Sequence, residues 1–256
     1  MSRKALYPVA RLLDFACRLL DLPPAAVLAR AGLPADPLTT ETHGVPAATY
    51  LQACAALAEL APRPDGILRL ARAVAHEPLH APIIAFSSSH DIRQGLERAA
   101  LFKPLSAPVR LEVSPTADSL RLAVTCAEPG LAASPFMGWF DIAFFTELCR
   151  VYSAARVVPG RVRMPVAPPG RAAYEAWLGA PITLGDEISL EISARDAARP
   201  LLSENTELWR RVEPTLRRQL RARLDPSTLT ERVERALADL LPAGKAGADH
   251  VAAALG

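Results

Sequence analysis

The sequence predicts an α+β fold, in which N-terminal helices are followed by an antiparallel sheet of about four strands, covered by helices, and then by an all-helical C-terminal segment. Apolar residues recur at three- and four-residue spacing in the N-terminal third, and this spacing returns after residue 203. Between residues 109 and 192, four stretches alternate apolar and polar side chains instead. This order is typical of helices packed on an antiparallel sheet.

The N-terminal third contains four predicted helices. The first presents an apolar face made of Val9, Leu12, Leu13, Ala16, Cys17 and Leu20. A proline pair breaks it and starts a second helix over residues 25–31, which Gly32 ends because glycine accepts the left-handed backbone found after many helices. Apolar periodicity predicts two further helices over residues 48–60 and 66–74.

The central part begins with a helix and a hairpin. Asp91 lies three residues before Gln94, a spacing typical of a capping box, and predicts a helix that runs to about Phe102. A Pro-Thr-Ala-Asp turn then separates two alternating stretches, so we expect a hairpin. The four predicted strands cover residues 109–113, 120–126, 162–166 and 188–192. Charged residues at alternate positions predict one apolar and one solvated face.

A helix rich in aromatic residues is predicted from Phe136 to about Ala155. Ser134 and Pro135 supply an N-cap and a proline at the first helical position. The residues at every fourth position form a stripe of Phe136, Phe140, Phe144, Leu148 and Tyr152. Because a helix that is apolar nearly all round is buried, we interpret the stripe as core packing or as the wall of an apolar ligand cavity.

Helical segments end the chain. In an Arg-rich helix over residues 207–224, Pro214 predicts a kink or a helix start. The apolar residues at every fourth position of this helix are Leu208, Val212, Leu216 and Leu220. We interpret it as a solvated linker, a segment close to nucleic-acid phosphates, or a dimer contact along the apolar stripe. A capping box at Thr228 then starts a helix that reaches Leu241, and a short helix over residues 248–255 follows.

Composition and motifs exclude several classes. The net charge of +2 is too small to imply a polyanion partner for the whole chain, no apolar run is long enough to span a membrane, and no signal peptide is visible. The cysteines are far apart in apolar stretches, which predicts reduced core residues in a cytoplasmic protein: Cys17, Cys54, Cys126 and Cys149. Dinucleotide, phosphate-loop, zinc and hydrolase motifs are missing, so we predict no cofactor, no metal and no enzyme activity.

Two clusters suggest chemistry. Ser89, His90 and Asp91 are the basis of an alternative prediction, a small-molecule hydrolase, although triad members are neighbours in space more often than in sequence. Because this run lies where a helix cap belongs, we favour the cap. His76 and His80 are four residues apart, but a proline between them disfavours a helical metal site, so we interpret them as loop histidines.

The order of several passages is informative. They are VLARAGLP (27–34) with VPAATYLQACAALAEL (45–60), PIIAFSSSHDIRQGLERAALFKPLSAPVRLEV (82–113), RVRMPVAPPGRAAYEAWLGAPITLGDEISLEI (161–192) and AARPL (197–201). In this order they resemble the N-terminal regulatory region of AraC-type transcriptional regulators, in the arabinose-binding-like branch, with the family's strand, Tyr-containing turn and strand in the third passage. The last passage, TLTERVERALADLLPAGKAGADHVAAALG (228–256), resembles the first helix and the positioning helix of the family's helix-turn-helix domain.

The resemblance implies a bacterial, effector-sensing transcription regulator that forms a homodimer. It divides the chain into an N-terminal helical part (1–80), an α+β ligand-sensing part (81–202), a linker helix (203–226) and the start of a helix-turn-helix domain (227–256). The family's recognition helix would follow Gly256, so we expect only the full-length protein to bind operator DNA. The central part is also similar to haem nitric-oxide-binding domains, but no histidine can be placed as an axial ligand, and no haem is predicted.

We expect the effector to bind between the aromatic helix and the sheet, and the linker helix to relay its binding. The predicted apolar walls are Phe86, Phe102, Phe136, Phe140, Phe144 and Tyr152, and the predicted anchors for an acid group are Arg98 and Lys103. Such walls suit an apolar or weakly acidic molecule. A dimerisation module that binds no ligand stays open as a further alternative.

Overall fold

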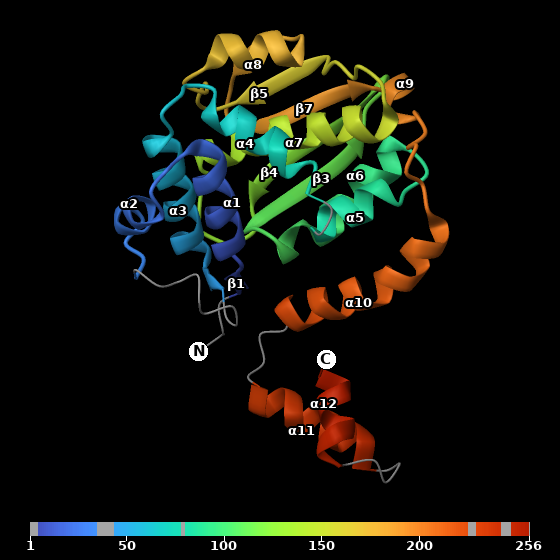
Figure 1. Ribbon diagram of the computed structural model, residues 1–256. Helices are drawn as coiled ribbons and strands as arrows, with labels where there is room; N and C mark the ends of the chain where they lie inside the picture. Colours follow the sequence, from blue (N-terminus) through green and yellow to red (C-terminus); the bar gives the residue numbers. More distant parts are fainter. Residues whose placement is uncertain (1–4, 35–43, 78–79, 225–228, 242–246, 256) are drawn as a thin grey trace.

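The computed structural model describes residues 5–34, 44–77, 80–224, 229–241 and 247–255. Its architecture is the predicted α+β one: helices at the N-terminal end, a five-stranded sheet covered by helices, and helices at the C-terminal end (Figure 1). One hydrophobic core runs through the chain from Tyr7 to Leu201. Within the described ranges, every helix is too short or too polar to cross a membrane.

All four predicted N-terminal helices are present. They are α1 (Ala10–Leu20), α2 (Pro24–Arg30), α3 (Ala47–Leu60) and α4 (Gly66–Val74). Gly32 follows α2 with a φ of +65°, the left-handed conformation that favours glycine. Two strands that the sequence did not predict, β1 (Leu6–Tyr7) and β2 (Val45–Pro46), pair in antiparallel orientation beside α3. Each has only two residues, which is too short to show a period.

The sheet has the strand order β3-β4-β7-β5-β6. Its strands are β3 (Val109–Pro115), β4 (Ser119–Cys126), β5 (Arg161–Met164), β6 (Ile182–Leu184) and β7 (Ile188–Ser193). The predicted hairpin joins β3 to β4. The prediction of a purely antiparallel sheet is wrong, because β5 and β6 are parallel and are connected by α8 (Arg171–Leu178), where we expected a turn. With three residues, β6 is too short for its alternation to be recognised.

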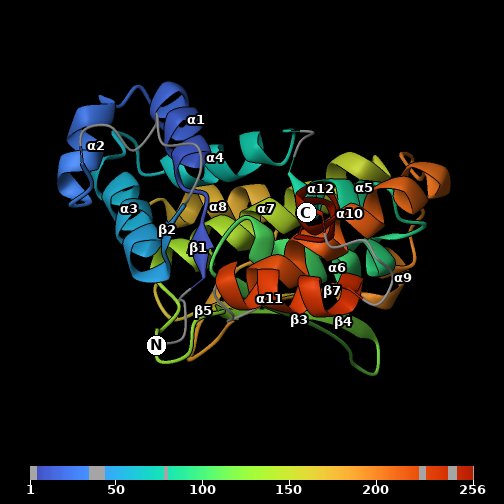
Figure 2. The ribbon, with the colours of Figure 1, turned by 90° about the horizontal axis from the view of Figure 1, so that it is seen from below.

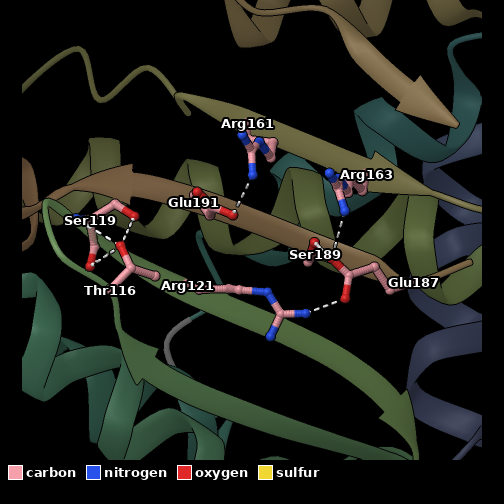
Figure 3. A network of polar contacts seen from close by, with 8 residues as sticks. All are labelled: Thr116, Ser119, Arg121, Arg161, Arg163, Glu187, Ser189 and Glu191. Atoms are coloured by element: carbon pink, nitrogen blue, oxygen red, sulfur yellow. Dashed lines mark hydrogen bonds and ion pairs between the residues drawn. The ribbon is translucent and has the colours of Figure 1, made fainter. Parts of the chain in front are cut away.

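The solvated face of the sheet carries a network of polar contacts (Figure 3). Glu187 accepts a hydrogen bond from Arg121 of β4 and pairs with Arg163 of β5 at 3.7 Å. On the same face, Arg161 pairs with Glu191 at 3.6 Å. The strand residues of this network occupy the polar positions of the predicted alternation, since successive side chains of a strand point to opposite faces. Partly exposed pairs of this kind contribute little to stability.

Helix α7 (Pro135–Ser153) lies between the sheet and other helices. It contacts α3, α4, α5, α6 and α8 as well as three strands of the sheet. In Figure 2 the strands lie along the lower edge and these helices lie on one side of them. The middle of α7 is buried on every side, as its all-round apolar character predicts. Gly138 lies on the side of α7 that faces the sheet, because a Cβ there would be in ordinary van der Waals contact with the Ile188 side chain, at 3.4 Å.

Three short elements precede the sheet: α5 (Ala81–Ser87), α6 (Ile92–Phe102) and the 3₁₀ turn η1 (Lys103–Leu105). Asp91 caps α6 as predicted, since its carboxylate accepts a hydrogen bond from the Gln94 backbone N–H at 2.8 Å. The reciprocal bond is shifted by one residue from a standard capping box: the Gln94 side chain accepts from the backbone N–H of His90 at 3.0 Å. A one-turn helix, α9 (Ala194–Ala197), follows the last strand.

The C-terminal helices also match the predicted ones. Helix α10 (Thr206–Leu224) continues through Pro214, so the alternative that this proline starts a helix is wrong. It packs on α5, α6 and η1 through a cluster of Ala85, Phe102, Trp209, Leu216 and Leu220. Helices α11 (Leu229–Leu240) and α12 (Ala248–Leu255) contact each other. Thr228, the predicted cap, and Gly256 lie outside the described residues.

Candidate functional site

A cavity of about 270 Å³ lies beside α7, and residues of α1, α3, α4, α5, η1 and α10 complete its wall. Its lining residues are Pro8, Arg11, Leu12, Tyr50, Leu51, Cys54, Val74, His80, Ala81, Pro82, Lys103, Leu105, Ser106, Ala107, Val109, Phe136, Met137, Phe140, Asp141, Phe144 and Gln219. A mostly apolar wall with few polar groups is typical of sites for small organic molecules.

One side of the cavity is a ladder of phenylalanine rings on α7. The Phe136 and Phe140 rings stack with centroids 5.5 Å apart, and the Phe140 and Phe144 rings stack at 5.7 Å. Both pairs are nearly parallel, with interplanar angles of 12° and 15°. The four-residue spacing places these rings one above the other on the helix, and together they form a continuous aromatic surface toward the cavity.

A buried ion pair lies beside this ladder. Lys103 Nζ, on η1, is 2.6 Å from Asp141 Oδ1, on α7, and the two residues are 5% and 2% exposed. The ammonium also lies 4.8 Å from the centre of the Phe144 ring, within the range of a cation–π contact. Burial raises the pKa of the Asp141 carboxyl, and the Lys103 charge opposes this rise. A buried pair adds little net stability, so its place in a cavity wall favours a role in binding.

Two more basic side chains line the cavity. Arg11, on α1, and His80, just before α5, line both the cavity and an adjoining hollow between α1 and the end of α4. Burial lowers the pKa of His80, and the charges of Arg11 and Lys103 lower it further. A lowered pKa favours the neutral imidazole at pH 7.

Helix α10 forms one edge of the cavity, where Gln219 lines it. The next turn of α10 is bonded to η1, because Arg223 donates a hydrogen bond to the Pro104 carbonyl at 3.2 Å. Near the start of α10, the Trp209 ring packs edge-to-face on Phe102 with centroids 5.8 Å apart. The cavity and α10 therefore both contact the turn η1, the cavity through Lys103 and Leu105 and α10 through Pro104.

The chain matches one family over most of its length. Residues 22–201 match the arabinose-binding domain of AraC transcription regulators, N-terminal. The chain belongs to this family. The crystal structure of the transcriptional regulator CdpR from Pseudomonas aeruginosa has a similar fold, with a TM-score of 0.54 and 14% identity over 90% of this chain and 71% of that one. No curated protein matches the sequence.

In this AraC-type domain, four of the eight residues predicted to bind the effector line the cavity: Phe136, Phe140, Phe144 and Lys103. The other four lie outside its lining. Phe86 packs against Tyr152 with ring centroids 6.0 Å apart. Phe102 is buried against Trp209, and Arg98 lies 4.3 Å from the centre of the same indole ring. These four side chains join α5, α6, α7 and α10 to one another.

The position of the cavity differs from the predicted one. It lies between α7 and the N-terminal helices of the AraC-type domain instead of between α7 and the sheet, and Val109 is the strand residue in its lining. The phenylalanine ladder faces away from the side of α7 where Gly138 touches the sheet. Tyr50, His80 and Asp141 were not predicted as lining residues. A carboxylate in the middle of an apolar helix is the signal in the sequence that marks Asp141.

The apolar stripe of α10 is mostly covered by other helices of the same chain. Leu216 and Leu220 are buried against α5 and α6, and Val212 packs beside them. Leu208 is 44% exposed. The stripe therefore packs α10 against helices of its own chain, and a homodimer along it stays a prediction.

The three residues of the alternative hydrolase cluster do not bond to one another, and each contacts a different group. The Ser89 hydroxyl donates to the Ala85 carbonyl at 2.8 Å, His90 Nδ1 lies 3.0 Å from a Glu204 carboxylate oxygen, and Asp91 caps α6. A catalytic triad needs these side chains bonded in series. Among the described residues no group of His, Cys, Asp and Glu side chains forms a potential metal site, and all four cysteines are free thiols.

Proposed function

We propose that the chain is the effector-sensing region of an AraC-type transcription regulator, and that a small apolar or weakly acidic molecule binds in the cavity beside α7. One observation carries the proposal: the same cavity is lined by the phenylalanine ladder of α7 and by Gln219 of the linker helix. A molecule in this cavity therefore touches both the sensing core and the segment that leads to α11 and α12.

The turn η1 is the proposed relay between the cavity and the linker helix. Lys103 and Leu105 line the cavity, and Leu105 also packs against the apolar cluster of α10. Between them, Pro104 accepts the hydrogen bond from Arg223. A ligand that binds better to one arrangement of η1 shifts the population of α10 positions. Allosteric coupling of this kind requires such a difference in affinity between two states.

We further propose the domain division that the family resemblance implies. The N-terminal helical part (1–80) and the α+β part (81–202) sense the effector, and the linker helix (203–226) transmits its binding. Residues 227–256 begin a helix-turn-helix domain, with α11 and α12 as its first two helices. Operator DNA is then a partner of the full-length regulator, because base contacts come mainly from the recognition helix.

The test compares the wild-type chain with a variant whose cavity is filled, Leu51→Trp, and with a control on the exposed surface of α6, Leu101→Trp. Native mass spectrometry should show a co-purified small molecule with the wild type and the control, and none with the filled variant. Amide hydrogen exchange should show that release of the molecule changes the protection of α10.

Two results would contradict the proposal separately. A co-purified molecule that stays bound to Leu51→Trp would exclude the cavity as its site. A molecule that leaves the cavity without any change of exchange in α10 would exclude the relay, even though the cavity binds a ligand.

A further inference from the structure

The polar groups of the cavity have an excess of positive charge. Lys103 and Arg11 are cationic, Asp141 is the acidic lining residue, and His80 is a base whose lowered pKa a nearby negative charge would raise. The adjoining hollow, which Arg11 and His80 also line, adds the charges of Asp14, Arg18 and Glu77, and Glu77 raises the pKa of His80. An uncharged effector would leave this excess unbalanced, and a cationic one would increase it.

The ammonium group of Lys103 can donate more hydrogen bonds than its contact with Asp141 uses. It has three N–H donors, and the Asp141 carboxylate takes one of them. The ammonium also lies close to aromatic rings, with the Phe144 and Phe145 ring centres 4.8 and 5.3 Å away. A second acceptor at this position would be largely shielded from water, where a charge-assisted hydrogen bond is at its strongest.

We infer that the effector is an apolar carboxylate whose acid group binds Lys103 in competition with Asp141 and whose apolar body lies on the phenylalanine ladder. The inference rests on the proposed function of the cavity and names its ligand class. In the free protein the Asp141 carboxylate is the partner of Lys103, and in the complex the effector carboxylate takes its place. When the effector binds, Asp141 gives up the ammonium and takes a proton from solvent, so that no unpaired charge stays buried.

This competition would be the first step of the proposed relay to α10. Lys103 is the first residue of η1, and the next residue is bonded to Arg223 of α10. An effector carboxylate that draws Lys103 from α7 toward the cavity changes the position of η1. A neutral molecule of the same shape fills the cavity but leaves the pair between Lys103 and Asp141 intact.

The experiment uses calorimetric titration of the purified chain with matched probes. They are linear carboxylates from butyrate to decanoate and phenyl-substituted ones from benzoate to phenylbutyrate, each compared with the alcohol and the amine of the same carbon skeleton. At least one carboxylate should bind the wild type at least about tenfold more tightly than its alcohol, the value of one charge-assisted hydrogen bond. The amines should bind no better than the alcohols.

Two variants separate this mechanism from simple cavity binding. Asp141→Asn removes the competitor and should strengthen carboxylate binding about tenfold. The double variant Lys103→Met with Asp141→Leu replaces the ion pair by two apolar side chains of similar volume, so it should fold. It should lose the preference for carboxylates and still bind the alcohols. Arg93→Met, on the exposed surface of α6, is the control for loss of one positive charge and should change nothing.

Equal binding of alcohols and carboxylates, preferred binding of amines, or no carboxylate binding to either the wild type or Asp141→Asn would overturn the inference. A preference for carboxylates that survives in the double variant would overturn the role of Lys103. If the co-purified molecule proves to be uncharged and occupies the cavity, this inference fails while the proposed sensing function stands.

Discussion

Lys103 Nζ and Asp141 Oδ1 are 2.6 Å apart, and the pair joins η1 to α7 at a point where almost no solvent reaches either side chain. The two residues are separated by 38 positions in the sequence, and the whole β3–β4 hairpin lies between them. The pair is therefore a tertiary contact that connects η1, the turn beside α10, to α7.

This contact predicts asymmetric effects of mutation on stability. Lys103→Met alone leaves a buried carboxylate without its partner and should lower the free energy of unfolding by about 3–5 kcal/mol. Lys103→Met combined with Asp141→Leu should recover most of that loss, because an apolar pair of similar volume replaces the ions. Urea unfolding followed by circular dichroism measures both. Equal loss in the single and double variants would contradict the assignment of a paired, buried ion.

The Trp209 contact predicts how α10 is held. Trp209→Ala removes the ring that packs on Phe102 and under Arg98, and should weaken the attachment of α10 by about 3 kcal/mol, as for other buried large-to-small changes. Hydrogen exchange should then be faster in residues 206–224 and unchanged in α7. Leu208→Ala, on the exposed side of the same helix, should change stability by less than about 0.5 kcal/mol. Faster exchange throughout the domain would show that α10 is not a separate unit.

At the contact between α5 and α6 there is no room for a side chain at Gly95. A Cβ at this position would lie 2.8 Å from Cδ2 of the Phe86 ring. Gly95→Ala should therefore destabilise the protein by about 1–3 kcal/mol, in spite of the higher helix propensity of alanine. The combination with Phe86→Leu should recover part of this loss. Thermal unfolding of the two variants measures the difference, and a Gly95→Ala variant that is more stable than the wild type would contradict the contact.

His80 predicts a dependence of stability on pH. Its pKa is lowered in the folded state, mainly by burial, whereas in the unfolded chain it is about 6.5. The unfolded state therefore binds more protons between these two values, and the free energy of unfolding should fall as the pH falls from about 7 through this window. His80→Asn should reduce this fall, and His250→Asn, at an exposed position, should not. A fall of equal size in His80→Asn would assign it to other groups.

Binding of a carboxylate should act on His80 in the opposite direction. A negative charge beside the imidazole raises its pKa, so proton uptake accompanies binding and the affinity should increase as the pH falls toward about 6. Titration calorimetry in buffers of different ionisation enthalpy would measure the uptake. His80→Asn should retain only the uptake that belongs to Asp141, and an affinity independent of pH in the wild type would contradict both contributions.

The sequence by itself determined the elements and the buried helix. Periodicity and caps predicted the long helices and four strands of the sheet, because these depend on contacts between residues a few positions apart. The phenylalanine ladder was also predictable, since Phe136, Phe140 and Phe144 lie one turn apart on a single helix.

Only the tertiary structure decided which of the predicted residues share a site. Phe86 and Phe102 are phenylalanines in apolar stretches, as the ladder residues are. In the structure, however, Phe86 packs against Tyr152 and Phe102 packs against Trp209, and neither lines the cavity. The parallel pairing of β5 and β6 and the meeting of η1 with α7 and α10 bring together residues that are far apart in the chain. Such contacts depend on how whole elements pack against one another, so the spacing of residues within one element does not predict them.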